Sequence, residues 1–238
     1  MQLDLKILKT TKLKLFLDYD GTLVPLTSRP EDAKPDEDLI NLLNDLDRKF
    51  PMFLITGRSA RDIQDFLDSK FEIIAMHGAQ LIHKGEKPRF LPGLEKFVEI
   101  CDQYYSKLKY LESEFPGLMV INKGGGIQFH YYYLKGDLNE LLPIIMENIP
   151  PGMELYSGKF VLEYRIKGIN KGKAILQHLE NGETALFAGD DTTDEEAFEL
   201  LKDHITIKVG EGETKANYRV KDYKEFRNLL WGISNESF

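Results

Sequence analysis

Short apolar segments alternate with helical patterns at both ends of this 238-residue chain, and this alternation constrains its fold more than any other feature. Residues 13–17, 51–55 and 72–76 are apolar runs of strand length, each followed by a turn that contains glycine. Residues 36–50 place leucine and isoleucine at helical spacing, and residues 59–67 open with a Ser-x-x-Asp capping pattern. Strands and helices in this order indicate a parallel α/β sheet.

The pattern changes in the middle of the chain. Residues 94–111 carry one apolar stripe and residues 138–148 a second, so both are predicted helices. Predicted strands cover residues 118–122, 127–133 and 160–166. The last two alternate apolar and polar side chains, which is typical of an antiparallel sheet with one open face. We therefore expect a small α+β domain here.

The first pattern then resumes. Asn170 is the expected cap of a helix, and Thr192 with Glu195 forms a possible capping box for another. The predicted helices cover residues 171–179, 192–201 and 223–231, and the predicted strands cover residues 184–188 and 205–209. The sequence thus predicts an α/β fold class with a doubly wound parallel sheet. Its core domain is discontinuous (1–90 and 167–238), and the α+β domain (91–166) is inserted into it.

Composition and charge limit the classes of partner. The net charge is −8 and no dense Lys/Arg run is present, so binding to nucleic acid or to an anionic membrane is disfavoured. The longest stretches without Asp, Glu, Lys or Arg have 11 residues, whereas a membrane-spanning helix needs about 20 apolar residues. One cysteine, Cys101, excludes an internal disulfide framework and a cysteine-based zinc site. We expect a cytoplasmic monomer that acts on a small molecule.

Two aspartates stand directly after the first predicted strand, in the run Asp18-Tyr19-Asp20-Gly21-Thr22. Because strand side chains alternate between faces, Asp18 and Asp20 are expected to point the same way past its end. Ligands of parallel sheets bind at the carboxyl ends of strands, and two adjacent carboxylates repel unless a cation or proton lies between them. The run is also ordinary Asp-Gly turn chemistry, but we favour a functional site.

Other polar residues fall at the same expected edge. Thr56 follows the second predicted strand, where a hydroxyl suits a phosphate oxygen, although a plain turn explains it when taken alone. Lys171 begins a helix, where a cation opposes the helix dipole. First-turn capping explains Asp194 but not Asp190, which precedes the expected cap. The conjunction of these groups at one sheet edge favours a site over separate turns.

Four motifs resemble, in chain order, those of the haloacid-dehalogenase (HAD) superfamily of phosphohydrolases: DYDGT (18–22), LITGR (54–58), NKGKA (170–174) and GDDTTDE (189–195). A narrower resemblance is to the trehalose-6-phosphate phosphatase family. It is carried by HGA (77–79), GLMVINKGGGIQFHY (117–131), GKFVLEYR (158–165) and VGEGETKA (209–216). The resemblance implies a HAD-like doubly wound core with an inserted α+β cap domain, and a Mg²⁺-dependent phosphatase that hydrolyses trehalose 6-phosphate.

The resemblance also implies roles for the motif residues. Asp18 would attack phosphorus and form an aspartyl-phosphate, and Asp20 would act as acid and base. The implied phosphate-binding residues are Thr56, Gly57 and Lys171. The implied Mg²⁺ ligands are the carboxylates of Asp18 and Asp190 and the backbone carbonyl of Asp20, with Asp191 and Asp194 orienting the metal shell and Lys171.

The inserted domain would close over the site and select the sugar, with Lys123, His130 and Glu163 as candidate substrate-binding residues. Two positions depart from the family pattern. Ile121 stands where the family has a glutamate, and Tyr132 where it has an arginine. The alternative substrates are therefore other glycosyl phosphates, such as sucrose phosphate or a glycosyl-phosphoglycerate.

Two alternatives belong to other functional classes. A phospho-accepting receiver module also uses an aspartate with Mg²⁺, but receivers are uncapped and lack an acid/base two residues after the nucleophile. A sugar-phosphate mutase would yield an isomer instead of free phosphate. The inserted domain and Asp20 favour the phosphatase over the receiver.

Overall fold

The computed structural model describes residues 12–27, 29–67, 70–158 and 160–235. The chain divides into two compact units. Unit 1 comprises the segments up to Arg89 and from Asn170 onward, and unit 2 is Phe90–Ile169. None of the described helices combines the length and the apolar character needed to cross a membrane.

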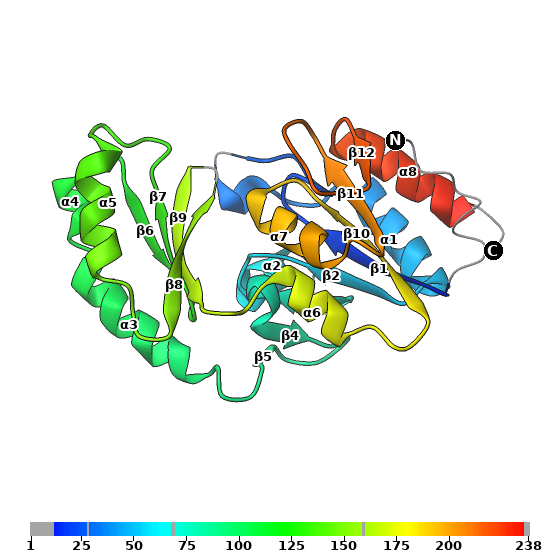
Figure 1. Cartoon of the computed structure of the whole chain (residues 1–238), viewed down its shortest axis with the longest axis horizontal. Coiled ribbons are helices and arrows are strands. Elements are labelled where there is room, and N and C mark those ends of the chain that lie inside the picture. Colours follow the sequence, from blue (N-terminus) through cyan, green and yellow to red (C-terminus); the bar gives the residue numbers. More distant parts are fainter. Residues whose placement is uncertain (1–11, 28, 68–69, 159, 236–238) are drawn as a thin grey trace. The chain divides into compact units, whose positions relative to one another are not determined.

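Unit 1 is built on a sheet with the strand order β12-β11-β10-β1-β2-β3-β4-β5 (Figure 1). Its strands are β1 (Lys12–Asp18), β2 (Met52–Ile55), β3 (Glu72–Ala75), β4 (Gln80–Ile82), β5 (Arg89–Phe90), β10 (Glu183–Gly189), β11 (Ile205–Val209) and β12 (Tyr218–Val220). The strands from β12 to β3 in this order pair in parallel, and β4 is antiparallel to β3. The predicted parallel α/β sheet is confirmed.

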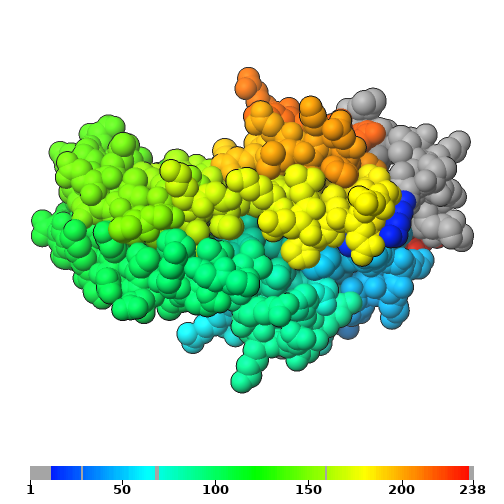
Figure 2. All heavy atoms as spheres, turned by 60° about the horizontal axis from the view of Figure 1, so that its bottom comes forward, coloured from blue at the N-terminus to red at the C-terminus, as the bar shows by residue number. Residues whose placement is uncertain are grey.

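The central pair of strands joins the two segments of unit 1. Strand β1 pairs with β10 from Lys12 opposite Glu183 to Leu17 opposite Ala188. The space-filling view shows the two segments, blue to cyan and yellow to red, packed side by side (Figure 2). Asp18 is the last residue of β1 and Asp190 directly follows β10, so both lie at the carboxyl ends of neighbouring parallel strands.

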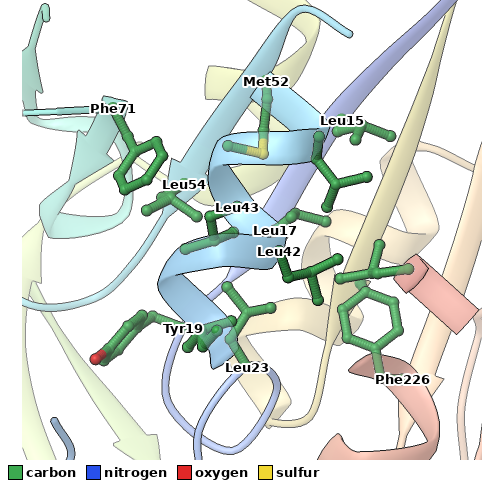
Figure 3. Close-up of a cluster of buried hydrophobic side chains, with 14 of the residues drawn as sticks. Leu15, Leu17, Tyr19, Leu23, Leu42, Leu43, Met52, Leu54, Phe71 and Phe226 are labelled. Carbon is green, nitrogen blue, oxygen red and sulfur yellow. The ribbon is translucent and has the colours of Figure 1, made fainter. Parts of the chain in front are cut away.

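Helices cover both faces of this sheet. They are α1 (Glu37–Lys49), α2 (Ala60–Leu67), α6 (Lys171–Gln177), α7 (Thr192–Leu200) and α8 (Tyr223–Asn235). One face packs its odd-numbered β1 residues, Leu15 and Leu17, against side chains of α1, α2 and α8, including Leu42 and Phe226 (Figure 3). On the other face Phe187 of β10 contacts Phe198 of α7. Burying both faces explains why the strands read as continuous apolar runs.

Unit 2 has a four-stranded antiparallel sheet with the order β6-β7-β9-β8. Its elements are α3 (Lys96–Leu108), α4 (Leu111–Glu114), β6 (Met119–Asn122), β7 (Ile127–His130), α5 (Leu138–Glu147), β8 (Met153–Gly158) and β9 (Val161–Ile166). Phe129 and Leu162 are buried on one side of this sheet, as are Cys101 of α3 and Ile145 of α5. The alternating Gln128 and His130 are on the opposite side of β7.

Several predicted boundaries were wrong. The sequence did not predict β4, β5, β8 or β12, which are short or lack β-branched residues and gain stability by pairing with neighbours. The helix expected over residues 94–111 divides into α3 and α4, and the strand expected to reach residue 133 ends at His130. The capping box of α7 is formed by Asp191 and Asp194, not by Thr192 and Glu195. Asn170 does cap α6 as expected, accepting from the Lys173 amide at 2.9 Å.

Candidate active site

Asp18, the last residue of β1, lies in a buried cluster of charged side chains. The Nζ atom of Lys171, at the first position of α6, donates to Oδ1 of Asp18 at 2.6 Å and to Oδ1 of Asp194 at 2.7 Å. Lys171 is held there because Asn170 caps the helix at the residue before it. The structure therefore brings together residues that are 153 positions apart.

Carboxylates outnumber the lysine in this cluster. Asp18, Asp190 and Asp194 each offer an oxygen, and these oxygens all lie within 4.8 Å of one another. Burial raises the pKa of Asp18 well above its ordinary value; the Lys171 charge lowers it in part, and the charges of Asp194 and Asp190 raise it further. Burial, and next the Asp194 charge, raise the pKa of Asp190 to about 7. With all three carboxyl groups ionised, the cluster would carry more negative charge than Lys171 neutralises.

Lys171 remains charged in this setting. Burial lowers its pKa, but the adjacent charges of Asp18 and Asp194 outweigh that effect, so the pKa lies above its ordinary value. A buried lysine with two carboxylate partners is a fixed cation at the edge of the sheet.

Asp194 and Asp191 have structural partners of their own. The second oxygen of Asp194, Oδ2, accepts from the backbone amide of Asp191 at 2.9 Å, so both Asp194 oxygens are engaged. Oδ1 of Asp191 accepts from the amide of Thr192 at 2.7 Å and starts α7. Gly189 lies under Asp194: a Cβ there would be 2.2 Å from Cγ of Asp194. Side-chain bulk at position 189 would displace this acid.

Asp190 lies over the turn that follows β1. Its Oδ1 accepts from the hydroxyl of Thr22 at 3.3 Å. Gly21 has a φ of +77°, and a Cβ at this position would be 2.1 Å from Oδ2 of Asp190. The Asp-Gly-Thr turn therefore admits the Asp190 carboxylate only because residue 21 is glycine.

Asp20 pairs with an arginine instead of joining the other carboxylates. Among the described residues, the close group of carboxylates comprises Asp18, Asp190 and Asp194, without Asp20. Both Asp20 oxygens instead accept from Arg58: Nε to Oδ2 at 2.7 Å and a terminal nitrogen to Oδ1 at 2.6 Å. The sequence did not predict this contact with Arg58.

The loop after β2 is fastened to the loop after β3. Thr56 is buried, its amide donates to Ile74, and its hydroxyl accepts from the Arg58 amide at 3.1 Å. The amides of Met76 and His77 donate to the carbonyls of Arg58 and Thr56. Met76 and His77 both have left-handed backbones, with φ of 48° and 58°. Such backbone strain persists only where the surroundings impose it. Here the hydrogen bonds from Met76 and His77 impose it, and the same bonds fix the loop that contains Thr56 and Gly57.

The three candidate substrate residues of unit 2 belong to one polar network. Nζ of Lys123 lies 2.7 Å from Oε1 of Glu163, and both side chains are buried. Gln128 donates to Oε2 of Glu163 at 2.9 Å and accepts from His130 at 3.1 Å. Burial and the Lys123 cation lower the pKa of His130, so its ring is neutral near pH 7.

Sequence reasoning missed three residues in these two regions. Lys208 of β11 is buried and donates to the backbone carbonyl of Asp190 at 2.6 Å; a lysine inside an apolar strand was the available signal. Arg58 stood in a quoted motif without a role. Gln128 faces Glu163 across the β7–β9 ladder, a pairing that local sequence does not reveal.

The chain is similar to known proteins over most of its length. The Trehalose-phosphatase family model matches residues 16–224. A trehalose-6-phosphate phosphatase-related protein of Thermoplasma acidophilum is 39% identical over 218 residues, covering 91% of this chain and 94% of that protein.

Two solved structures show the same fold. The crystal structure of a trehalose-6-phosphate phosphatase related protein has a TM-score of 0.86 at 39% identity, covering 93% of this chain and 96% of that one. A haloacid dehalogenase-like hydrolase from B. subtilis has a TM-score of 0.63 at 14% identity, covering 93% and 99%, and supports the HAD-like fold alone. With the family model spanning both units, the chain belongs to the trehalose-phosphatase family of phosphoric monoester hydrolases.

Proposed function

We propose that this chain hydrolyses trehalose 6-phosphate to trehalose and phosphate through an aspartyl-phosphate on Asp18. The observation that carries the proposal is the buried contact of Asp18 with Lys171, among carboxylates at the carboxyl ends of parallel strands. Family membership supports the substrate.

The proposed reaction has two displacements. A carboxylate oxygen of Asp18 forms a bond to phosphorus while the bond from phosphorus to the sugar oxygen breaks, and Asp20 gives that oxygen a proton. A water oxygen then attacks phosphorus, the bond to Asp18 breaks, and Asp20 takes a proton from the water. Together the two displacements consume one water, release the sugar and phosphate, and return Asp18 and Asp20 to their starting states.

Thr56, Gly57 and Lys171 are the proposed phosphate-binding groups. Lys171 supplies a fixed positive charge beside Asp18, and Thr56 supplies a hydroxyl in a backbone pinned by Met76 and His77. Phosphoryl transfer depends mostly on positioning and on neutralising charge at the phosphoryl oxygens. These residues provide both.

The donor set fits Mg²⁺. All of its atoms are oxygens, which this hard cation prefers. Burial first, and neighbouring carboxylates next, raise the pKa values of Asp18 and Asp190, and a bound cation would favour the ionised form of both. We propose the carboxylates of Asp18 and Asp190 and the carbonyl of Asp20 as ligands. Asp194 and Asp191 act as supports, because both Asp194 oxygens are engaged and Asp191 caps α7. When bound, Mg²⁺ supplies positive charge for the phosphoryl oxygens.

Lys123, His130 and Glu163 are proposed to bind the sugar, with unit 2 as the cap. Glu163 and the neutral His130 offer hydrogen-bond groups suited to hydroxyls, and Gln128 fixes both. Ile121 lies opposite Gln128 in the β6–β7 ladder, so the amide stands beside the position where the family pattern has a glutamate.

A phosphate-release assay with Mg²⁺ tests the function. The substrates are trehalose 6-phosphate, sucrose 6-phosphate, glucosyl-phosphoglycerate and glucose 6-phosphate. We expect the highest kcat/KM with trehalose 6-phosphate. Preference for another glycosyl phosphate would change the substrate only, whereas an isomeric product without free phosphate would refute the hydrolase.

The setting of the enzyme is also a proposal. We propose a monomer in the cytoplasm without nucleic-acid or membrane partners, supported by the net charge of −8 and the lone cysteine. Light scattering after size-exclusion chromatography tests the monomer.

A further inference from the structure

The guanidinium of Arg58 contacts Asp20 and several residues around it. Its guanidinium donates twice to the Asp20 carboxylate, at 2.7 and 2.6 Å, and once to the backbone carbonyl of Pro30 at 2.8 Å. The same guanidinium lies over the ring of Phe66, 4.8 Å from its centroid, and 5.9 Å from the centroid of Tyr19. Arg58 is thus fixed by three segments of unit 1.

This arrangement determines the orientation of the Asp20 carboxyl group. A two-point contact between a guanidinium and a carboxylate is planar, so it fixes the plane of the carboxylate as well as its distance. A carboxylate has about four lone-pair positions and Arg58 occupies two, so each oxygen keeps capacity for another proton or hydrogen bond. Arg58 therefore fixes the Asp20 carboxylate and leaves its oxygens able to exchange a proton with a substrate.

We propose that Arg58 is a positioning residue that aligns Asp20 for proton transfer. The inference rests on the proposed function, in which Asp20 is the acid and base. Arg58 acts through Asp20 and does not contact the phosphoryl group or the sugar. Misalignment of a reacting group by about 1 Å costs about 100-fold in rate, so loss of the planar contact is expected to slow proton transfer to the leaving oxygen.

The experiment compares two substrates with different needs for that proton. The leaving oxygen of trehalose 6-phosphate is an alkoxide and needs protonation, whereas p-nitrophenolate leaves without it. We expect Arg58→Met to lower kcat for trehalose 6-phosphate by about 10- to 100-fold with KM little changed. In a single turnover of p-nitrophenyl phosphate, the rate of nitrophenolate release is expected to fall less than about threefold, because nitrophenolate leaves without a proton. The later hydrolysis of the phosphoenzyme uses Asp20 as a base and is expected to slow with both substrates.

A second variant and a matched control separate positioning from folding. Arg58→Lys keeps the charge but not the two-point contact, and is expected to recover only part of the loss. Arg227 is the control, because its guanidinium also contacts one carboxylate, that of Asp36, and one backbone carbonyl, that of Leu23. The side chains of Arg58 and Arg227 are 11% and 14% exposed. Arg227→Met is expected to lower the melting temperature without changing the ratio of the two activities.

A double-mutant cycle decides the matter. If Arg58 acts only through Asp20, then Arg58→Met adds no further loss in an Asp20→Asn background. A further loss there, an equal loss in the single-turnover rate of leaving-group release from both substrates, or a faster enzyme after Arg58→Met would each overturn the proposal. Absence of trehalose 6-phosphate hydrolysis by the wild type would instead overturn the proposed function, and the two failures are thus distinguishable.

Discussion

The two units contain buried charge of different kinds. In unit 1, Asp18, Asp190 and Asp194 share the Lys171 cation, and the pKa of Asp190 rises to about 7. In unit 2, one lysine faces one glutamate at 2.7 Å, supported by a neutral amide and a neutral imidazole. An unbalanced cluster favours a cation and suits phosphoryl chemistry. A balanced pair needs no ion and suits a neutral polyol. The difference supports the proposal that unit 1 transfers the phosphoryl group and unit 2 binds the sugar.

Replacement of the proposed nucleophile is expected to have the largest effect. Asp18→Asn removes the attacking carboxylate, so phosphate release should fall by about 10⁴-fold or more with every substrate. Steady-state assays with trehalose 6-phosphate and p-nitrophenyl phosphate measure this. Wild-type rates from the purified variant would show that Asp18 is not the nucleophile, and the carboxylate cluster of unit 1 would then have no role in phosphoryl transfer.

Replacement in the balanced pair should affect only the sugar substrate. Glu163→Gln removes a charged acceptor from the proposed sugar site, so kcat/KM for trehalose 6-phosphate should fall by about 10- to 100-fold. Activity with p-nitrophenyl phosphate should change by less than about twofold, because that substrate has no sugar. Glu112→Gln is the control, since Glu112 also pairs with a lysine in unit 2, Lys109 at 2.7 Å, but on α4. Equal losses with both substrates would make Glu163 structural.

Magnesium should stabilise the protein through unit 1 alone. At a hundred times its dissociation constant, a ligand of the folded state adds about 2.7 kcal/mol, or roughly 5–10 °C of melting temperature in a protein of this size. Scanning fluorimetry in EDTA and in Mg²⁺ should show this shift for the wild type and for Glu163→Gln. Asp190→Asn should lose most of it, and an undiminished shift in that variant would exclude Asp190 as a ligand.

The metal-free protein should show the smallest effect, a dependence on pH. The pKa of Asp190 is about 7 in the folded state against an ordinary 3.8, so between these values the folded protein holds a proton that the unfolded chain releases. This contribution to the free energy of unfolding is present at low pH and is lost as the pH rises through 7. In EDTA, the melting temperature of the wild type relative to Asp190→Asn should rise by about 2–5 °C from pH 7.5 to 5.5. No change, or a fall, would contradict the raised pKa.

Local sequence was sufficient for the parts of the fold and site that depend on one segment. Apolar runs identified β1, β2 and β3, and their ends identified Asp18 and Thr56. Local sequence was insufficient where a partner far along the chain determines how a side chain is oriented. The Asp20 carboxylate is directed by Arg58, 38 residues away, and the amide of Gln128 by Glu163, 35 residues away. Strand β8 is stabilised by its ladder with β9, which a pattern of alternating side chains alone does not reveal.

Trapping the phosphoenzyme tests the central claim that Asp18 carries the phosphoryl group. Asp20→Asn should still accept a phosphoryl group from p-nitrophenyl phosphate, because nitrophenolate leaves unaided, but should be slow to hydrolyse the intermediate. Acid quenching followed by peptide mass spectrometry should then find phosphate on Asp18. Phosphate on another residue, or a variant that turns over p-nitrophenyl phosphate while no residue is ever phosphorylated, would contradict the account.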